Sequence, residues 1–161
     1  MKIAIVRLSA IGDIVHSMVV LQFIKKYYPN SVIDWVVEKR FKAIIENNPH
    51  INEIHQVSLK SAKESKSIYL LLKELRKIYK LGKYDLVIDM QGLLKSALVA
   101  RMIPSDTTLG FDKDSLRESL AAIFYDQKFK IDYAKNVIER NLNLVSYALK
   151  FSFDKEDVLS K

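Results

Sequence analysis

The sequence predicts a doubly wound α/β fold, in which helices cover both faces of a Rossmann-like parallel sheet. Three observations support this prediction. Several short runs are continuously apolar, such as IAIV at residues 3–6, as strands buried on both faces require. These runs alternate along the chain with longer segments whose apolar residues recur at helical spacing. The 161 residues contain no internal repeat and no Pro/Gly-rich linker, so we expect one compact domain.

The first third of the chain reads as three strands separated by helices. Residues 2–8 (KIAIVRL) form the first buried strand, and residues 13–28 follow as a helix whose apolar positions recur at helical spacing. Residues 32–37 (VIDWVV) form a second buried strand. Residues 40–49 form a short helix that Pro49 stops, and residues 53–59 (EIHQVSL) form a third strand.

The middle of the chain contains a polar loop and one further strand–helix unit. Residues 60–66 (KSAKESK) are expected to be a flexible loop, which leads into a helix with apolar positions between Leu71 and Tyr79 and with Gly82 at its end. Residues 84–90 (YDLVIDM) read as a fourth buried strand. The segment QGLLKSALVARM, residues 91–102, then reads as a turn and a helix that stops before a proline.

Three more elements are expected towards the end. Residues 107–111 (TTLGF) predict a further strand. Ser115 and Glu118 have the spacing of a capping box, which predicts that a helix starts there. A last helix is expected to begin near Asn136, with a buried stripe made by four apolar residues: Ile138, Leu142, Val145 and Leu149.

Composition limits the classes of function. Lys and Arg total 26 against 19 Asp and Glu, and the net charge of +7 suits an anionic partner such as nucleic acid, phosphorylated lipid or a membrane face, although surface lysine alone can produce it. The chain has no cysteine, which excludes disulfides and thiolate metal sites. Neither a signal peptide nor a run of about 18 apolar residues is recognisable, so a cytoplasmic protein is expected.

Two loops follow strands at the sheet edge where parallel sheets bind ligands. The segment RLSAIGDIVH comes after the first strand and DMQGLLKS after the fourth, and each contains one glycine that permits a tight turn. Neither loop has the G-x-G-x-x-G or P-loop pattern, which argues against standard nucleotide binding. No serine stands in a nucleophile elbow, so the sequence gives no support for hydrolase chemistry.

Asp13, in the first of these loops, has two interpretations. Aspartate is a favoured helix cap, and the position alone favours capping over acid–base chemistry. His16 is expected on the same helix face. No metal site is expected, because His50 and His55 are remote from these residues and no carboxylate has ligand spacing.

Several longer stretches resemble a known family. The first 41 residues, from MKIAIVRLSAIGD to VVEKRF, resemble the start of the lipopolysaccharide heptosyltransferases of glycosyltransferase family 9. The segment YDLVIDMQGLLKSALVAR resembles the family's second signature, and SLRESLAAIFYD and VIERN resemble later ones. The resemblance covers nearly the whole chain and favours the type I enzymes over type II.

The resemblance implies an inverting glycosyltransferase of the two-domain GT-B fold. Such an enzyme transfers L-glycero-D-manno-heptose from ADP-heptose to Kdo of Kdo-lipid A in the inner core of lipopolysaccharide, without a cofactor. Family enzymes are about twice as long, so residues 1–161 correspond to the amino-terminal, acceptor-binding domain, and the donor domain lies outside this chain. The domain alone is then expected to be inactive, and the enzyme to be peripheral on the cytoplasmic face of the inner membrane. That anionic surface is an expected partner, and nucleic acid is not.

The resemblance also implies roles for individual residues. Asp13 takes the place of the general base that receives the proton of the attacking Kdo hydroxyl. The acceptor carries carboxylates and phosphates, and the residues placed around it are Arg7, Ser9, Gly12, His16, Lys60, Lys63, Gln91, Gly92, Lys95, Ser96, Arg117 and Arg140. Lys66 adds to the basic segment, which in this sequence spreads its lysines among serines where the family clusters arginines. Arg117 is expected in the first turn of its helix, and Arg140 opposite the apolar stripe of the last helix.

Two alternatives stay open at this point. One is a type II or related core heptosyltransferase, which acceptor assays separate because type II enzymes require an acceptor that already carries one heptose. The other is a non-catalytic, basic nucleic-acid-binding module. Against that module, the aromatic residues Phe23, Tyr27, Trp35 and Phe124 fall on apolar stripes and form no visible stacking platform.

Overall fold

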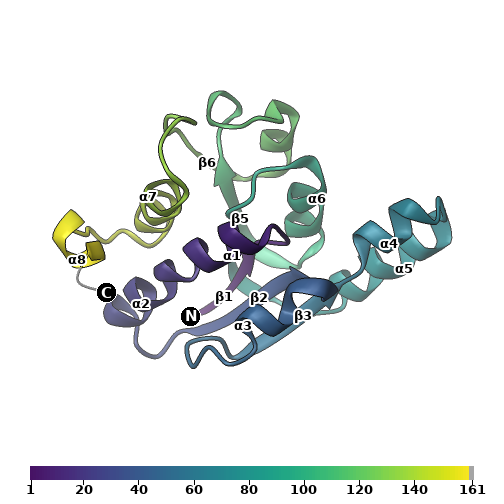
Figure 1. The fold of residues 1–161 in the computed structure, drawn as a ribbon, viewed down its shortest axis with the longest axis horizontal. Coiled ribbons are helices and arrows are strands. Elements are labelled where there is room, and N and C mark those ends of the chain that lie inside the picture. The colour runs from purple at the N-terminus through teal and green to yellow at the C-terminus, as the bar shows by residue number, and fades with distance from the viewer. Residues whose placement is uncertain (160–161) are drawn as a thin grey trace.

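A computed structural model describes residues 1–159 and confirms the predicted α/β class (Figure 1). Six parallel strands form one sheet in the order β3-β2-β1-β4-β5-β6. The strands are β1 (Lys2–Val6), β2 (Val32–Glu38), β3 (Glu53–Val57), β4 (Tyr84–Asp89), β5 (Ser105–Phe111) and β6 (Gln127–Phe129). The order reverses direction between β1 and β4, and this point is the topological switch of a doubly wound sheet.

Helices cover both faces of this sheet. They are α1 (Ile11–Ser17), α2 (Val19–Tyr27), α3 (Lys42–Ile45), α4 (Leu59–Glu64), α5 (Ile68–Tyr79), α6 (Leu94–Met102), α7 (Val137–Leu149) and α8 (Lys155–Leu159). Three short 3₁₀ turns complete the fold: η1 (Lys39–Phe41), η2 (Lys113–Ser115) and η3 (Ser119–Phe124). Within the described residues, no helix has the length and apolar character needed to cross a bilayer.

Alternating side chains of β1 build two separate cores. Ile3 and Ile5 point to the face covered by α1, α2, α3 and α7, where they join a large apolar cluster with Trp35 and Phe23. Ala4 and Val6 point to the opposite face, which α5 and α6 cover. All four β1 side chains are fully buried, which explains the continuously apolar sequence of this strand.

Five of the six strands lie where the sequence predicts them, with ends shifted by up to two residues. The strand β6 was not predicted. It has only three residues, QKF, and two of them are exposed because it is the edge strand, so it lacks a recognisable apolar run. The last helix begins as predicted, with the Asn136 side chain accepting a hydrogen bond from the Glu139 N–H at 2.8 Å. Gly82 has a φ of +91° in the turn that follows α5.

Three expectations about helices are wrong: those for residues 13–28, for residues 60–66, and for a helix start at Ser115 and Glu118. The helix predicted over residues 13–28 is two helices, α1 and α2, separated at Met18. Residues 60–66 are not a loop, because α4 occupies most of this segment and packs Leu59 and Ala62 inward. Such a short helix shows too few turns for its periodicity to stand out in the sequence.

Ser115 and Glu118 do not form a capping box. Leu116 between them is extended, with φ −121° and ψ 145°, so only 3₁₀ turns form on either side. The Ser115 hydroxyl donates to Asp112 at 2.7 Å. The Glu118 carboxylate accepts instead from the backbone N–H of Leu94, the first residue of α6, at 3.0 Å. These two side chains therefore support neighbouring segments and start no helix of their own.

Candidate functional site

The two predicted loops meet at the switch point of the sheet. The loop after β1 leads into α1 on one face, and the loop after β4 leads into α6 on the other. The region between these two loops, called the crevice below, is where doubly wound sheets bind ligands. The strands β1 and β4 are paired, with Val6 opposite Asp89 at their carboxyl ends. Segments about 80 positions apart in the sequence are thus brought together at the edge where parallel sheets bind ligands.

Gln91 and Arg7 join the two loops. The Gln91 side-chain oxygen accepts hydrogen bonds from the backbone N–H groups of Leu8 (2.8 Å) and Ser9 (3.2 Å), and its amide donates to the Ser9 hydroxyl at 3.3 Å. In return, Arg7 Nη1 donates to the Met90 carbonyl at 2.8 Å. Each loop therefore holds the backbone of the other.

Asp89 holds the second loop from inside. This fully buried carboxylate accepts from the backbone N–H groups of Gln91 (2.9 Å) and Gly92 (3.3 Å) and from the hydroxyls of Ser96 (2.9 Å) and Tyr125 (2.5 Å). Burial raises the pKa of Asp89, while these four hydrogen bonds lower it in part. Asp89 was predicted only as part of the strand end and of the DMQGLLKS segment, and its role in holding the loop was not predicted.

Asp13 stands at the mouth of the crevice, paired with Arg7. The Arg7 Nη2 and Asp13 Oδ2 atoms lie 2.8 Å apart, and the side chains are 8% and 42% exposed, respectively. Burial lowers the pKa of Arg7, opposed by the negative charges of Asp13 and Asp89. Asp13 does not cap the helix as expected: Ala10 occupies the cap position, and Asp13 is the third residue of α1. The carboxylate is held by a buried cation and is still accessible to solvent.

Arg140 lies on the other side of this region and is buried, although its spacing places it opposite the apolar stripe of α7. Its guanidinium stacks on the Phe111 and Tyr133 rings, 4.5 and 4.9 Å from their centroids, and donates to the Ser115 carbonyl at 2.8 Å. Burial lowers the pKa of Arg140, and the positive charge of Arg7 lowers it further. The segment between β5 and α7 folds over this side of the helix, which a helical projection of the sequence does not reveal.

The other predicted site residues differ in how far they are exposed to solvent. Gly12, His16, Lys95 and Arg117 are exposed, and Ser9 is half-buried. Arg117 lies in the bend between η2 and η3, and not in the first turn of a helix. Ser96 is fully buried and bonded to Asp89, so it supports the loop from within and does not face a ligand. Gly92 is also buried, with a φ of +72°, and a Cβ there would come within 2.4 Å of the Leu116 side chain.

A second hollow lies beside the crevice. This groove of about 890 Å³ has an apolar lining that includes Leu59, Leu71 and Leu75. Its charged lining residues are Glu38, Arg40, Lys60, Lys63, Glu64, Lys66 and Lys95. The structure thus brings the predicted basic segment and Lys95 into one groove, and adds Arg40 and Glu38, which sequence analysis missed. Position alone could have indicated Glu38, since it ends β2 at the ligand-binding edge of the sheet.

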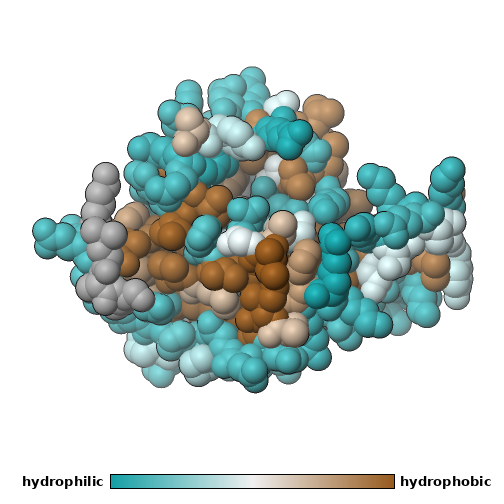
Figure 2. Space-filling view, viewed as in Figure 1, coloured by the Kyte–Doolittle hydropathy of each residue, from teal (hydrophilic) through white to brown (hydrophobic). Residues whose placement is uncertain are grey.

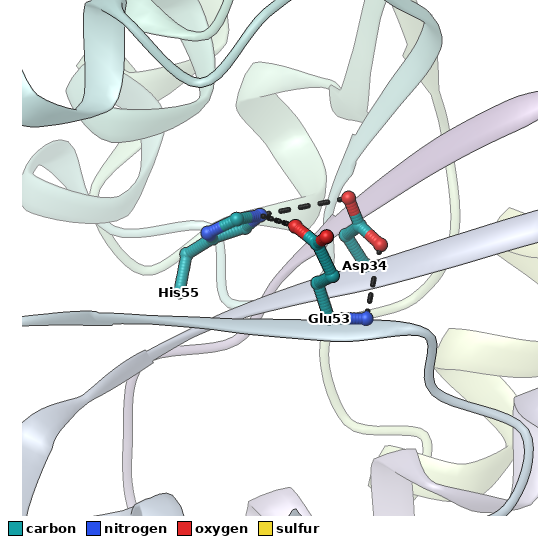
Figure 3. Close-up of side chains that lie close together, drawn as sticks. All are labelled: Asp34, Glu53 and His55. Atoms are coloured by element: carbon teal, nitrogen blue, oxygen red, sulfur yellow. Dashed lines mark hydrogen bonds and ion pairs between the residues drawn. The ribbon is translucent and has the colours of Figure 1, made fainter.

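A third group of polar side chains lies on β2 and β3, away from the crevice. Asp34 from β2 and Glu53 and His55 from β3 place their ligand atoms within 4.8 Å of one another (Figure 3). Burial raises the pKa of Asp34, but its interactions with His55 and Tyr84 outweigh this effect, so the pKa lies below its ordinary value. The expectation that no carboxylate has ligand spacing to a histidine is therefore wrong. Residues two apart on a strand share a face, and the paired strand brings in Asp34.

Figure 2 shows one more feature near the crevice: hydrophobic side chains gather over the middle of the face on which α1 lies in Figure 1. Ile11 and Val15 of α1 are 60% and 47% exposed, on either side of Asp13 in the sequence. The crevice therefore has an apolar border next to its charged residues.

Comparisons with known proteins agree on one family. The profile of glycosyltransferase family 9 (heptosyltransferase) matches residues 71–160. Lipopolysaccharide heptosyltransferase 1 of Campylobacter coli is 48% identical over the whole chain, which covers 45% of that protein. The corresponding protein of Escherichia coli K12 is 30% identical over 94% of the chain and 49% of its own length. The chain thus spans about half the length of these relatives.

Solved structures give the same result. The E. coli heptosyltransferase WaaC, determined with ADP, superimposes with a TM-score of 0.87 at 29% identity, over 96% of this chain and 49% of WaaC. E. coli ADP-heptose lipopolysaccharide heptosyltransferase II superimposes with a TM-score of 0.67 at 20% identity, over 89% of this chain and 40% of that one, and this likeness shows the fold alone.

Proposed function

From the premise that this chain belongs to glycosyltransferase family 9, the heptosyltransferases, we propose that it is the acceptor-binding, base-supplying domain of a lipopolysaccharide inner-core heptosyltransferase. One observation carries the proposal: the half-exposed Asp13 carboxylate, fixed by the buried Arg7 at the switch point of a parallel sheet. Family membership also disfavours the nucleic-acid-binding alternative. The type I reaction, transfer of heptose from ADP-heptose to Kdo-lipid A, fits the relatives named above best.

In this reaction Asp13 acts as the general base. Its Oδ2 is held by Arg7, so Oδ1 is the oxygen that receives the proton of the attacking Kdo hydroxyl. The hydroxyl oxygen forms its bond to the anomeric carbon of heptose as the bond from that carbon to the ADP oxygen breaks on the opposite face. ADP leaves with the electron pair, and this single displacement inverts the configuration. Because a carboxylate is a weak base, the proton moves late, when the attacking oxygen has become acidic.

The remaining parts of the crevice position these groups. Gln91 and Asp89 fix the two loops, so that Arg7 and Asp13 need little reorganisation when the acceptor arrives. The donor site lies in a second domain in this proposal. WaaC has been solved with ADP-2-deoxy-2-fluoro heptose, which supports a nucleotide-sugar donor. Residues 1–161 alone are accordingly expected to fold without catalysing transfer.

The basic groove suits an anionic lipid acceptor on a membrane. Lys60, Lys63 and Lys66 line it together with leucines, which matches a molecule that carries phosphates and acyl chains. The start of α5 lies next to this groove and exposes Ile68 and Tyr69, each 74% accessible. Apolar side chains beside lysines are typical of a helix that rests on an anionic membrane surface. These features support the proposal that the protein works at the cytoplasmic face of the inner membrane, with the crevice turned towards the lipid-anchored acceptor.

Substitution of Asp13 tests the base. In the two-domain enzyme, Asp13→Asn keeps the size of the side chain and removes the basic oxygen, so kcat should fall about 10²–10⁴-fold while donor affinity is unchanged. The matched control is Glu139→Gln, since Glu139 is also the third residue of its helix and also pairs with a cation, Lys135, at 3.2 Å. A folded Asp13→Asn enzyme with nearly normal kcat would rule out Asp13 as the base.

A vesicle experiment tests the membrane surface separately. Replacing Lys60, Lys63 and Lys66 with glutamine should reduce sedimentation with anionic vesicles and weaken its dependence on salt, because exposed charges are screened within about 8 Å at physiological ionic strength. Replacing three exposed lysines elsewhere, Lys128, Lys130 and Lys150, preserves the net charge change and should have much less effect. Equal losses in the two triple variants would refute the assignment of the groove.

A further inference from the structure

We propose that Asp34, Glu53 and His55 form a binding site for a divalent transition-metal ion, best matched by Zn²⁺, that fastens the edge strand β3 to β2. This site lies outside the proposed reaction. Asp34 and Glu53 lie in the amino-terminal halves of their strands and His55 lies in the middle of β3, whereas Asp13 follows the carboxyl end of β1. The ion would therefore lie away from the crevice, and its role would be structural.

The distances from the His55 nitrogen to the two carboxylates fit ligands that share a metal ion. His55 Nε2 contacts the Tyr84 hydroxyl at 3.2 Å, but it lies 3.5 Å from Asp34 Oδ2 and 3.6 Å from Glu53 Oε2, beyond the usual N–H···O range of about 2.7–3.2 Å. A tetrahedral Zn²⁺ with bonds of about 2.0–2.2 Å separates its ligand atoms by about 3.3–3.6 Å. Figure 3 shows the imidazole edge and both carboxylates directed toward one another.

The strand pairing arranges this geometry. Asp34 and Glu53 are partners in the parallel ladder, and His55 follows two positions later, on the same face of β3 as Glu53. The three ligands thus come from two adjacent strands whose relative position is fixed by backbone hydrogen bonds. The exposed Glu53 side chain can rotate to complete the site, and it leaves a solvent path for the ion.

Hydrogen bonds from other residues fix the Asp34 carboxylate, as is usual for carboxylates that bind metal ions. Its Oδ1 accepts from the Glu53 N–H at 3.1 Å, and its Oδ2 accepts from the Tyr84 hydroxyl at 2.6 Å. Such hydrogen bonds from outside the ligand set orient the ligand and strengthen metal binding. Two carboxylates and a neutral imidazole also balance the charge of a divalent cation, in a chain whose net charge is +7.

Zinc titration of the purified chain, followed by calorimetry and by thermal unfolding, tests the site. The wild type should bind one equivalent of Zn²⁺ more tightly than Mg²⁺, which prefers six oxygen ligands, and its Tm should rise with Zn²⁺. His55→Ala and Glu53→Gln should lose this binding. Glu53→Gln alters a side chain that is 71% exposed, so it tests the site even if His55→Ala folds poorly.

Two further variants distinguish a built site from incidental zinc binding. Tyr84→Phe retains all three ligands and removes a hydroxyl that contacts both Asp34 Oδ2 (2.6 Å) and His55 Nε2 (3.2 Å), so affinity should fall about 10–100-fold. His50→Ala removes a histidine outside the cluster and should bind Zn²⁺ like the wild type. The proposal is overturned if the wild type binds no equivalent of Zn²⁺, or if the substitutions at His55 and Glu53 change binding no more than His50→Ala does.

Discussion

Removal of the Tyr125 hydroxyl tests how strongly the buried carboxylate Asp89 depends on its hydrogen bonds. Tyr125 is 3% exposed and packs among Ala97, Ala121 and Ala122, so Tyr125→Phe preserves the ring and its packing. What it removes is the 2.5 Å hydrogen bond to Asp89 Oδ2. That oxygen then retains only the Ser96 hydroxyl, at 2.9 Å.

The size of the effect follows from the charge and burial of Asp89. A hydrogen bond to a charged group contributes about 1.5–3 kcal/mol, and no cavity larger than one oxygen is created, so the free energy of unfolding should fall by about that amount. With a urea m-value of about 2 kcal/mol/M, the midpoint should fall by roughly 1 M. Tyr79→Phe is the matched control, since Tyr79 is 63% exposed and its replacement should change stability by less than about 0.5 kcal/mol.

The effect should also depend on pH. Burial raises the pKa of Asp89 above its ordinary value of 3.8, so the folded state binds more protons than the unfolded state between the two values, and this group's contribution to stability decreases as pH rises through that interval. Tyr125 lowers the pKa of Asp89, so its loss widens the interval. Tyr125→Phe should therefore destabilise more towards the alkaline end of a pH series than towards its acidic end, in urea unfolding followed by circular dichroism. A loss below about 0.5 kcal/mol at every pH, or a loss that does not change across the series, would refute this reasoning.

Three further predictions concern stability, each measured as a free energy of unfolding in urea. Gly110→Ala should lower the free energy of unfolding by about 1–3 kcal/mol or more, because its Cβ would lie 2.3–2.6 Å from three atoms of the Tyr125 ring. The control Gly12→Ala should not destabilise, since no atom lies within 4 Å of its Cβ. Asn136→Ala should cost about 1 kcal/mol, since the side chain caps α7; a change near zero would contradict this role. Arg140→Leu should cost about 1.5–3 kcal/mol through its lost hydrogen bonds, while Arg101→Leu, which breaks an exposed pair with Asp126, should cost under about 1 kcal/mol.

The fold was largely predictable because its central strands are fully buried. The segments around β1, β2 and β4 are rich in buried apolar residues, and this pattern is visible in the sequence before the neighbouring strands are known. The elements that were missed depend on tertiary contacts. The short strand β6 exists through its pairing with β5, and the extended Leu116 prevents the helix that Ser115 and Glu118 suggested. Neither the pairing of β6 with β5 nor the extended conformation of Leu116 can be recognised from the local sequence.

The site was predictable in its loops and less so in its contacts. Glycine and polar residues directly after buried strands identified both segments of the crevice, and the strand order then brings them together. The pairing of Arg7 with Asp13 and the buried position of Arg140 depend on side-chain direction, which spacing along the chain does not determine. The cluster around His55 was missed for a related reason, because Asp34 enters it from another strand.

The bonds between the two loops also affect how the protein is made. Arg7 and Met90 are 83 positions apart, and a ribosome adding about 5–20 residues per second needs about 4–17 s to cover that distance. During this time β1 can pair with β2, but its other edge, which β4 covers in the finished sheet, has no partner yet. An unpaired apolar edge is a template for aggregation. The nascent chain is therefore most in need of chaperone protection after β2 has emerged and before β4 has.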